Sequence, residues 1–193
     1  MTDLALSFDP QTGAMPGREP SSVRRLSDLR GCFADGAAFE AAVAAGDPVV
    51  YEVTSVDAGN GPGDLAYGVG VLYPGRVGDE FYLTRGHVHE WREAAEIYLT
   101  TRGRGLMLMQ DERTGRAWAE PMTENGILVV PAFTLHRTVN VGDEPLVYIG
   151  INPAAAGHDY GVVQNPGFAQ VAVADPQGSA AGLTGVRVKE RTA

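Results

Sequence analysis

The sequence predicts an all-β fold, a jelly-roll barrel preceded by an N-terminal arm and one short helix. From residue 48 to about residue 153, short apolar or alternating runs are separated by Gly, Pro, Asn and Asp, the pattern of successive strands and turns. The 193 residues are 44% hydrophobic, which is enough for one compact domain with its own core. Seven or eight strands of this length suit a jelly roll.

Before the strand-rich segment, the sequence predicts an arm and then a helix. Residues 1–25 carry three prolines and two glycines without a clear period, so we expect an arm that lies over the domain. Residues 35–46, DGAAFEAAVAAG, predict a helix with Asp35 as its N-cap and Gly46 at its end. Phe39 and Val43 would share the face of the helix that packs on the domain.

The predicted single domain spans residues 26–174. Its predicted strands are 49–56, 67–73, 80–84, 96–101, 106–110, 116–120, 126–130 and 146–151. From Asp175 onward the apolar pattern fades and the chain becomes polar. We therefore expect a loosely ordered C-terminal tail over residues 175–193.

Composition argues against several classes of function. The net charge of −9 disfavours nucleic acid and anionic membranes as partners, because both select for a basic face. The only lysine is Lys189, so catalysis through a lysine imine is not expected. Cys32 is the only cysteine, and we find neither a secretion signal nor an apolar run of membrane-spanning length. These features favour the reducing cytoplasm.

Three of the four histidines fall in a pattern that metal chemistry explains. His87 and His89 are two apart in an extended segment, so both imidazoles project to the same face. Glu96 opens the next predicted strand, and an antiparallel neighbour would bring its carboxylate beside that pair. His136 follows Pro131 and a turn, from which it can close the site across the barrel. Three imidazoles and one carboxylate suit one divalent ion, and Fe, Mn, Zn and Ni all remain open.

These residues resemble the two metal-binding motifs of the cupin superfamily. The first motif contains His87, His89, Glu96 and Gly103, and the second contains Pro131, His136 and Asn140. Six residues separate His89 from Glu96, a longer gap than is usual in cupins. With TRGHVH before the gap and AEIY at its end, the first motif resembles the cupin-type glucose-6-phosphate isomerases, best known from archaea. The resemblance covers residues 20–170 and includes SVRRLSDLRGCF, DPVVYEV, VLYPGRVGDEFYLTRGH, HRTVNVGDEPL and AGHDYG.

The resemblance implies a metal-dependent isomerase that interconverts glucose 6-phosphate and fructose 6-phosphate through an enediol-type intermediate. Its ligands would be His87, His89, Glu96 and His136, and Glu96 would also be the general base. The candidates for substrate binding, at or beside the matching positions, are Tyr51, Thr84, Arg85, Gly86, Tyr98, His158 and Tyr160. The resemblance also implies a homodimer whose small-molecule partner is a sugar phosphate.

Three positions depart from the family pattern, and each loses a hydroxyl. Gly70 stands where the family carries Thr near the phosphate, Phe133 where Tyr is usual, and Asn152 in place of another Tyr. Because a hydrogen bond to a charged group contributes roughly 1.5–3 kcal/mol, three losses would weaken phosphosugar recognition by orders of magnitude. Three alternatives therefore stay open: a metal enzyme that isomerises or epimerises another sugar phosphate or polyol, an iron-dependent dioxygenase, and a non-catalytic sugar-binding cupin.

Overall fold

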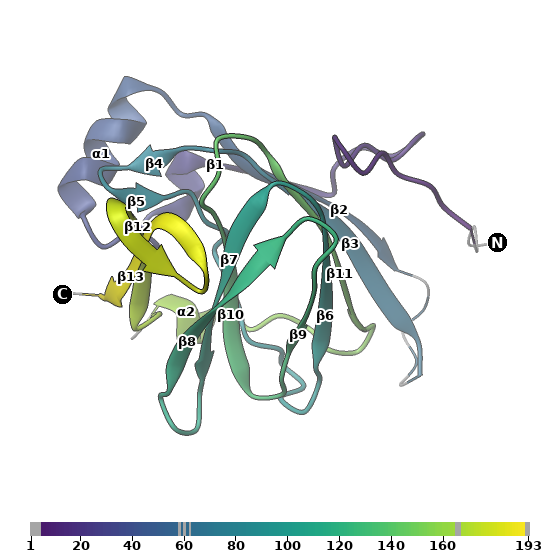
Figure 1. The fold of residues 1–193 in the computed structure, drawn as a ribbon. Coiled ribbons are helices and arrows are strands. Elements are labelled where there is room, and N and C mark those ends of the chain that lie inside the picture. Colours follow the sequence, from purple (N-terminus) through teal and green to yellow (C-terminus); the bar gives the residue numbers. More distant parts are fainter. Residues whose placement is uncertain (1–4, 58, 60, 62, 165–166, 192–193) are drawn as a thin grey trace.

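The chain folds as the predicted all-β jelly-roll barrel, with helix α1 and two short strands at one end (Figure 1). A computed structural model describes residues 5–57, 59, 61, 63–164 and 167–191. The elements are β1 (Ser22–Arg25), the 3₁₀ helix η1 (Leu26–Leu29), α1 (Gly36–Ala45), β2 (Val49–Asp57), β3 (Leu65–Leu72), β4 (Arg76–Val77), β5 (Glu80–Phe81), β6 (Glu96–Arg102), β7 (Arg104–Asp111), β8 (Ala117–Thr123), β9 (Ile127–Val130), β10 (Thr134–Asn140), β11 (Leu146–Pro153), α2 (Gly161–Gln164), β12 (Gln170–Ala180) and β13 (Leu183–Glu190).

Two antiparallel sheets form the walls of the barrel. The larger has the strand order β1-β2-β3-β11-β6-β9, and the smaller has the order β10-β7-β8. Neighbours that are far apart in the chain, such as β3 and β11, require connections that cross between the sheets, as in a jelly roll. Both sheets contribute to one buried core, which includes Leu72, Leu106, Leu108, Leu135 and Leu146.

Helix α1 forms where the sequence predicts it. The Asp35 side chain accepts a hydrogen bond from the Ala38 N–H at 2.8 Å, which satisfies one of the free donors of the first turn. Phe39 is buried, and Val43 packs against the core beside it. The Gly46 N–H closes the last turn by donating to the Ala42 carbonyl.

The strand predictions hold for most of the barrel and are wrong in two places. The predicted strand 80–84 is only the short β5, followed by one isolated bridge between Leu83 and Val139. In addition, β10 was not predicted, because its sequence TLHRTVN lacks the alternation of a half-exposed strand. Every residue of β10 is buried, including His136, Arg137 and Asn140. Buried polar side chains therefore hid a strand at one edge of the smaller sheet.

The prediction of a loosely ordered tail from residue 175 is wrong for the described residues. Strands β12 and β13 form a hairpin from Gln170 to Glu190, and β12 also pairs with β5. The pairing register shifts between Ala174 and Ser179, so the DPQG segment interrupts the alternation that would reveal a strand. Val173 and Val186 are buried nonetheless, and they anchor the hairpin to the body of the protein.

The N-terminal arm packs on the outer face of the larger sheet. Met15 lies in a second apolar cluster with Val56, Val69, Val71 and Val147. The Thr101 side chain donates to the Pro10 carbonyl at 2.9 Å, which ties the arm to β6. The end of the predicted arm is the strand β1, which pairs with β2 and so belongs to the sheet. Neither α-helix in the part of the chain described is long and apolar enough to cross a membrane.

Candidate metal centre and substrate pocket

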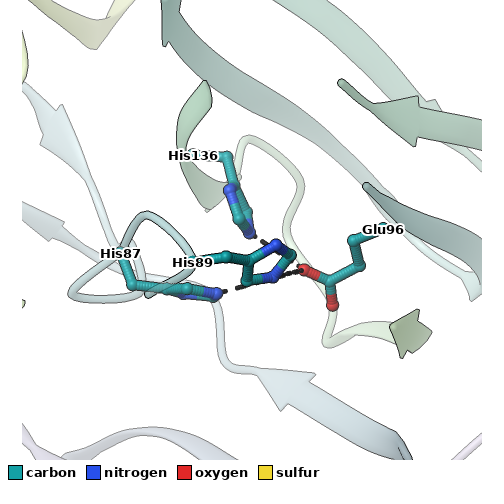
Figure 2. Close-up of side chains that lie close together, drawn as sticks. All are labelled: His87, His89, Glu96 and His136. Atoms are coloured by element: carbon teal, nitrogen blue, oxygen red, sulfur yellow. Dashed lines mark hydrogen bonds and ion pairs between the residues drawn. The ribbon is translucent and has the colours of Figure 1, made fainter. Parts of the chain in front are cut away.

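Three segments of the barrel bring the four predicted metal ligands together. His87 and His89 lie on the chain between β5 and β6, where His87 forms a bridge with His136 of β10. Glu96 is the first residue of β6 and pairs with Val130 of β9. Figure 2 shows the four side chains pointing toward one another, and one potential ligand atom from each lies within 4.8 Å of all the others.

The Glu96 carboxylate stands at the centre of this group. Its Oε2 lies 3.0 Å from Nε2 of His136, 3.3 Å from Nε2 of His89 and 4.0 Å from Nε2 of His87. All four residues have little exposed side-chain surface, and His136 is 1% exposed. The three imidazoles thus present the same ring nitrogen to one buried point.

In two of the three imidazoles the other ring nitrogen is already engaged, which fixes the tautomer of the neutral ring. His89 Nδ1 lies 3.2 Å from the Ala94 carbonyl oxygen, and His136 Nδ1 lies 3.0 Å from the Thr134 carbonyl oxygen. A carbonyl only accepts, so each of these Nδ1 atoms carries a proton, and in the neutral ring Nε2 keeps a free lone pair. The Nε2 atoms of His87 and His89 are buried without a hydrogen-bond partner. A divalent cation bound at this point would satisfy these nitrogens, so the donor set fits a metal.

The protonation states of the histidines and Glu96 fit their role as metal ligands. Burial and the neighbouring His136 hold the pKa of His87 well below its usual value, so this imidazole is neutral and free to coordinate. Burial acts against ionisation of Glu96, yet His136 and His89 donate from Nε2 to its carboxylate when their rings are protonated, and these contacts prevail and lower the pKa of Glu96. For His89, burial is outweighed by the contact with Glu96, and its pKa is raised. The carboxylate is therefore ionised at neutral pH.

The metal ligands lie in the wall of a cavity of about 390 Å³, which is large enough for a small sugar phosphate. Every predicted substrate-binding residue lines this cavity, namely Tyr51, Thr84, Arg85, Gly86, Tyr98, His158 and Tyr160. His87, Glu96 and His136 line it as well, whereas His89 lies buried behind them. The structure thus brings all the predicted site residues to one place.

The mouth of the cavity carries aromatic and basic side chains. The rings of His158 and Tyr160 are stacked, with centroids 6.1 Å apart, and the His158 ring lies 4.3 Å from that of His87. The Arg85 guanidinium lies 6.0 Å from the Tyr160 ring and donates to the Asp28 carbonyl. Desolvation by these neighbours lowers the pKa of His158, so its ring is neutral at pH 7.

A sequence model described as glucose-6-phosphate isomerase (GPI) matches residues 23–181 of this chain. The chain belongs to the glucose-6-phosphate isomerase family. A glucose-6-phosphate isomerase of Pyrococcus abyssi is 42% identical over 88% of this chain and 89% of its own, and one of Thermococcus onnurineus is 43% identical over 88% of each. The enzyme of Sinorhizobium medicae is 37% identical over 89% of this chain and 80% of its own.

The likeness to solved structures is weaker. An oxalate oxidase aligns with 59% of this chain and 56% of its own at 16% identity and a TM-score of 0.48, which is too low to bear on function. Membership of the glucose-6-phosphate isomerase family therefore rests on the sequence comparisons.

The three residues that depart from the family pattern lie at different places relative to the cavity. Phe133 does not line the cavity; its ring lies under the Arg113 guanidinium at 4.3 Å, and its φ of 60° is in the left-handed region that side chains other than glycine rarely adopt. Asn152 lines the cavity and donates to the Pro153 carbonyl. Gly70 lines it too, and the ring of Tyr148 lies against it.

Several residues of the cavity wall were not predicted from the sequence. Among them are Thr138 on β10 and Tyr148 and Gly150 on β11. A Cβ on Gly150 would lie 2.7 Å from Oε1 of Glu96, so a side chain at residue 150 would require the carboxylate to shift. Gly150 comes to the site through strand register, because it pairs with Tyr98 across β6 and β11. The sequence of neither strand alone reveals this pairing.

Arg92 links the metal-binding segment to the mouth of the cavity. Its guanidinium donates to the His89 carbonyl and forms ion pairs with Glu112 at 3.0 Å and Asp159 at 2.6 Å. Backbone hydrogen bonds in both directions between Val88 and Asp159 reinforce this connection. The arginine thus holds together the segment that carries His87 and His89 and the one that carries His158 and Tyr160.

Proposed function

We propose that this chain is a metal-dependent aldose-ketose isomerase that interconverts glucose 6-phosphate and fructose 6-phosphate. One observation carries the proposal: in a member of the glucose-6-phosphate isomerase family, three imidazoles and a carboxylate converge within 4.8 Å in the wall of a substrate-sized cavity. His87, His89, Glu96 and His136 would hold one divalent ion, with Fe, Mn, Zn and Ni as the candidates. When bound, the ion supplies Lewis-acid stabilisation of negative charge on the O1 and O2 edge of the sugar.

The two oxygens of Glu96 have different surroundings, which supports two roles. Oε2 faces the three imidazoles, whereas Oε1 lies beside Gly150 at the cavity wall. We assign Oε1 to the proton transfer: it takes a proton from C1 of fructose 6-phosphate and returns it to C2. A second proton moves from O1 to O2, so the C2 carbonyl becomes a hydroxyl and a C1 carbonyl forms. The lowered pKa of Glu96 keeps the acceptor ionised at neutral pH.

The remaining cavity residues fit the substrate that we propose. Tyr98 is buried beside the metal centre, and burial holds the pKa of its hydroxyl well above the usual value. It therefore keeps its proton and is available to donate to a sugar oxygen. Gly86, with a φ of 77°, and Thr84 would receive the phosphate, and Arg85 and His158 would add donors at the mouth.

We also propose that the protein acts as a homodimer in the cytoplasm. Ile97, Ile127 and Val129 form an exposed apolar strip on the outer face of β6 and β9, with Ile127 73% exposed. Burial of such a strip against a second copy would remove it from water. Light scattering coupled to size-exclusion chromatography would give twice the chain mass; a monomer at micromolar concentration would contradict the dimer.

The function is tested by a coupled assay for the conversion of fructose 6-phosphate to glucose 6-phosphate. The purified protein is treated with EDTA, and Fe(II), Mn(II), Zn(II) or Ni(II) is added back separately. We expect turnover to disappear and to return with at least one ion. A protein that binds metal but converts neither hexose phosphate would contradict the assignment and favour the alternative of a related enzyme with another substrate.

The same assay in D₂O separates proton transfer from a direct hydride shift. If Glu96 exchanges the transferred proton with solvent, deuterium appears at C2 of the glucose 6-phosphate product. Complete retention of the substrate hydrogen would leave Glu96 as a metal ligand only.

A further inference from the structure

A group of three hydroxyls lines the cavity away from the metal ligands. The side-chain oxygens of Thr84 and Thr138 are 3.2 Å apart, and Thr138 Oγ1 lies 3.3 Å from the Tyr148 hydroxyl. We call these three residues the hydroxyl cluster. All of them line the cavity, next to Gly86.

Tyr148 reaches this position only because residue 70 is glycine. Tyr148 of β11 pairs with Gly70 of β3, and a Cβ on Gly70 would lie 2.4 Å from Cζ, 2.5 Å from Cε2 and 2.7 Å from the hydroxyl oxygen of Tyr148. Contacts this short do not occur between real atoms, so any side chain at residue 70 would displace the ring. The Tyr148 hydroxyl therefore occupies the space that a residue 70 side chain would fill.

The hydroxyl cluster lies at a suitable distance from the metal centre. Thr138 is two residues beyond His136 on β10, which places it about 7 Å further along the strand on the same face. The Tyr98 ring lies between the two ends of the cavity, with its centroid 6.0 Å from that of His136 and 5.5 Å from that of Tyr148. An open-chain hexose with C1 and C2 at the metal ligands spans this distance with its sixth carbon.

The hydroxyl of Tyr148 is built to remain a donor. Tyr148 is 6% exposed, and burial raises its pKa, so it keeps its proton. Its hydrogen-bond partner, Thr138 Oγ1, is itself a hydroxyl that both donates and accepts. The cluster can therefore reorient its protons toward an anion without breaking the fold.

We propose that the Tyr148 hydroxyl binds the phosphate group of the substrate together with Thr84 and Thr138. Gly70 and Tyr148 then act as a pair, in which the tyrosine supplies the hydroxyl that the glycine lacks. This inference rests on the proposed function, because it assumes a phosphorylated sugar as the ligand of the cavity.

The decisive variant is Tyr148→Phe, which removes one oxygen and keeps the ring. We expect KM for fructose 6-phosphate and the inhibition constant of inorganic phosphate each to rise about tenfold, with kcat changed much less. The matched control is Tyr73→Phe, which removes a hydroxyl that donates to Glu52 at 3.2 Å outside the cavity. The control should leave both constants unchanged. Equal constants for Tyr148→Phe and the parent protein would overturn the proposal.

A second set of variants tests the pairing itself. Gly70→Thr and Tyr148→Val should each weaken phosphate binding, the first by displacing the ring and the second by removing it. The double variant should bind phosphate better than Tyr148→Val alone, because Thr at residue 70 then has room to donate its own hydroxyl. Thermal unfolding of each variant separates this coupling from loss of folded protein. Additive effects of the two changes would contradict the pairing.

Calorimetric binding of inorganic phosphate distinguishes failure of this inference from failure of the proposed function. If the parent protein shows no isomerase turnover but Tyr148→Phe weakens phosphate binding, the hydroxyl cluster is supported and the assigned reaction is wrong. If the parent protein turns over and binds phosphate no better than Tyr148→Phe does, the reaction stands and the cluster has no role in it. Absence of phosphate binding in the parent protein would also refute the cluster.

Discussion

The metal end and the hydroxyl end of the cavity are built in different ways. At the metal end, four side chains point at one position, and backbone carbonyls leave the imidazoles of His89 and His136 a single usable neutral tautomer. At the hydroxyl end, hydroxyls from different residues can serve the same purpose, because the Tyr148 hydroxyl lies close to where a hydroxyl of a residue 70 side chain would lie. The first arrangement tolerates no replacement of a donor, whereas the second allows a hydroxyl to move between strands.

This difference explains one departure of the chain from its family, the glycine at residue 70. The metal ligands and Tyr98 match the pattern, and every departure that touches the cavity lies at Gly70 or Asn152. The third departure, Phe133, is outside the cavity and removes nothing from it. Variants that change one end alone are therefore the sharpest way to test the comparison.

The largest effect is expected for Glu96→Gln at the metal end. The amide keeps the shape of the side chain but cannot accept a proton, so turnover should fall by a factor of about 100 or more while the fold is preserved. The coupled assay gives the rate, and circular dichroism checks the fold. Near-normal turnover would remove Glu96 from the role of base.

His87→Ala should act on the metal before it acts on the fold. Loss of one of four ligand atoms is expected to lower metal affinity by more than about tenfold, while the strands on either side stay intact. Metal content is measured by plasma mass spectrometry after dialysis, beside the circular dichroism spectrum. A variant with full metal content would contradict the ligand assignment.

Arg92→Met should have a smaller effect, because it acts through the two segments that Arg92 joins. We expect kcat/KM to fall by about tenfold, with weaker metal binding as well, since both the His89 carbonyl and Asp159 lose their partner. Arg92→Lys should restore part of the loss. Arg102→Met is the control: it breaks contacts with Glu144 and the Gln11 carbonyl outside the cavity and should leave kcat/KM unchanged. If Arg92→Met and Arg102→Met change kcat/KM equally, the contacts of Arg92 with the two segments do not contribute to function.

The smallest predicted effect is the dependence of metal affinity on pH. In the metal-free protein the pKa of His89 is raised by Glu96, so near neutral pH a proton competes with the metal for Nε2. Affinity should therefore rise with pH, by less than about tenfold per unit for one released proton, and level off above the raised pKa. Titration calorimetry between pH 6 and pH 8 measures this slope. An affinity that falls as pH rises would contradict the assignment of His89.

The sequence predicts the metal end well and the hydroxyl end poorly, for a physical reason. His87, His89 and Glu96 lie close in the chain, so spacing and strand alternation suffice to bring them together. Tyr148 contributes only through its register with Gly70, which depends on how β3 and β11 pair. Strand β10 was missed for a related reason, since its polar residues are buried and conceal the strand pattern. The C-terminal hairpin was missed because its pairing is interrupted between Ala174 and Ser179.

The close contact between Gly70 and Tyr148 also constrains how this cavity can evolve in the laboratory. A larger residue at position 70 meets the tyrosine ring at 2.4 Å, so saturation of that site alone would return mostly clones with weakened phosphate binding. Replacement of Tyr148 alone would leave a void beside the glycine. Libraries aimed at a new phosphorylated substrate should therefore randomise the two codons together, because productive combinations are not reachable through either single change.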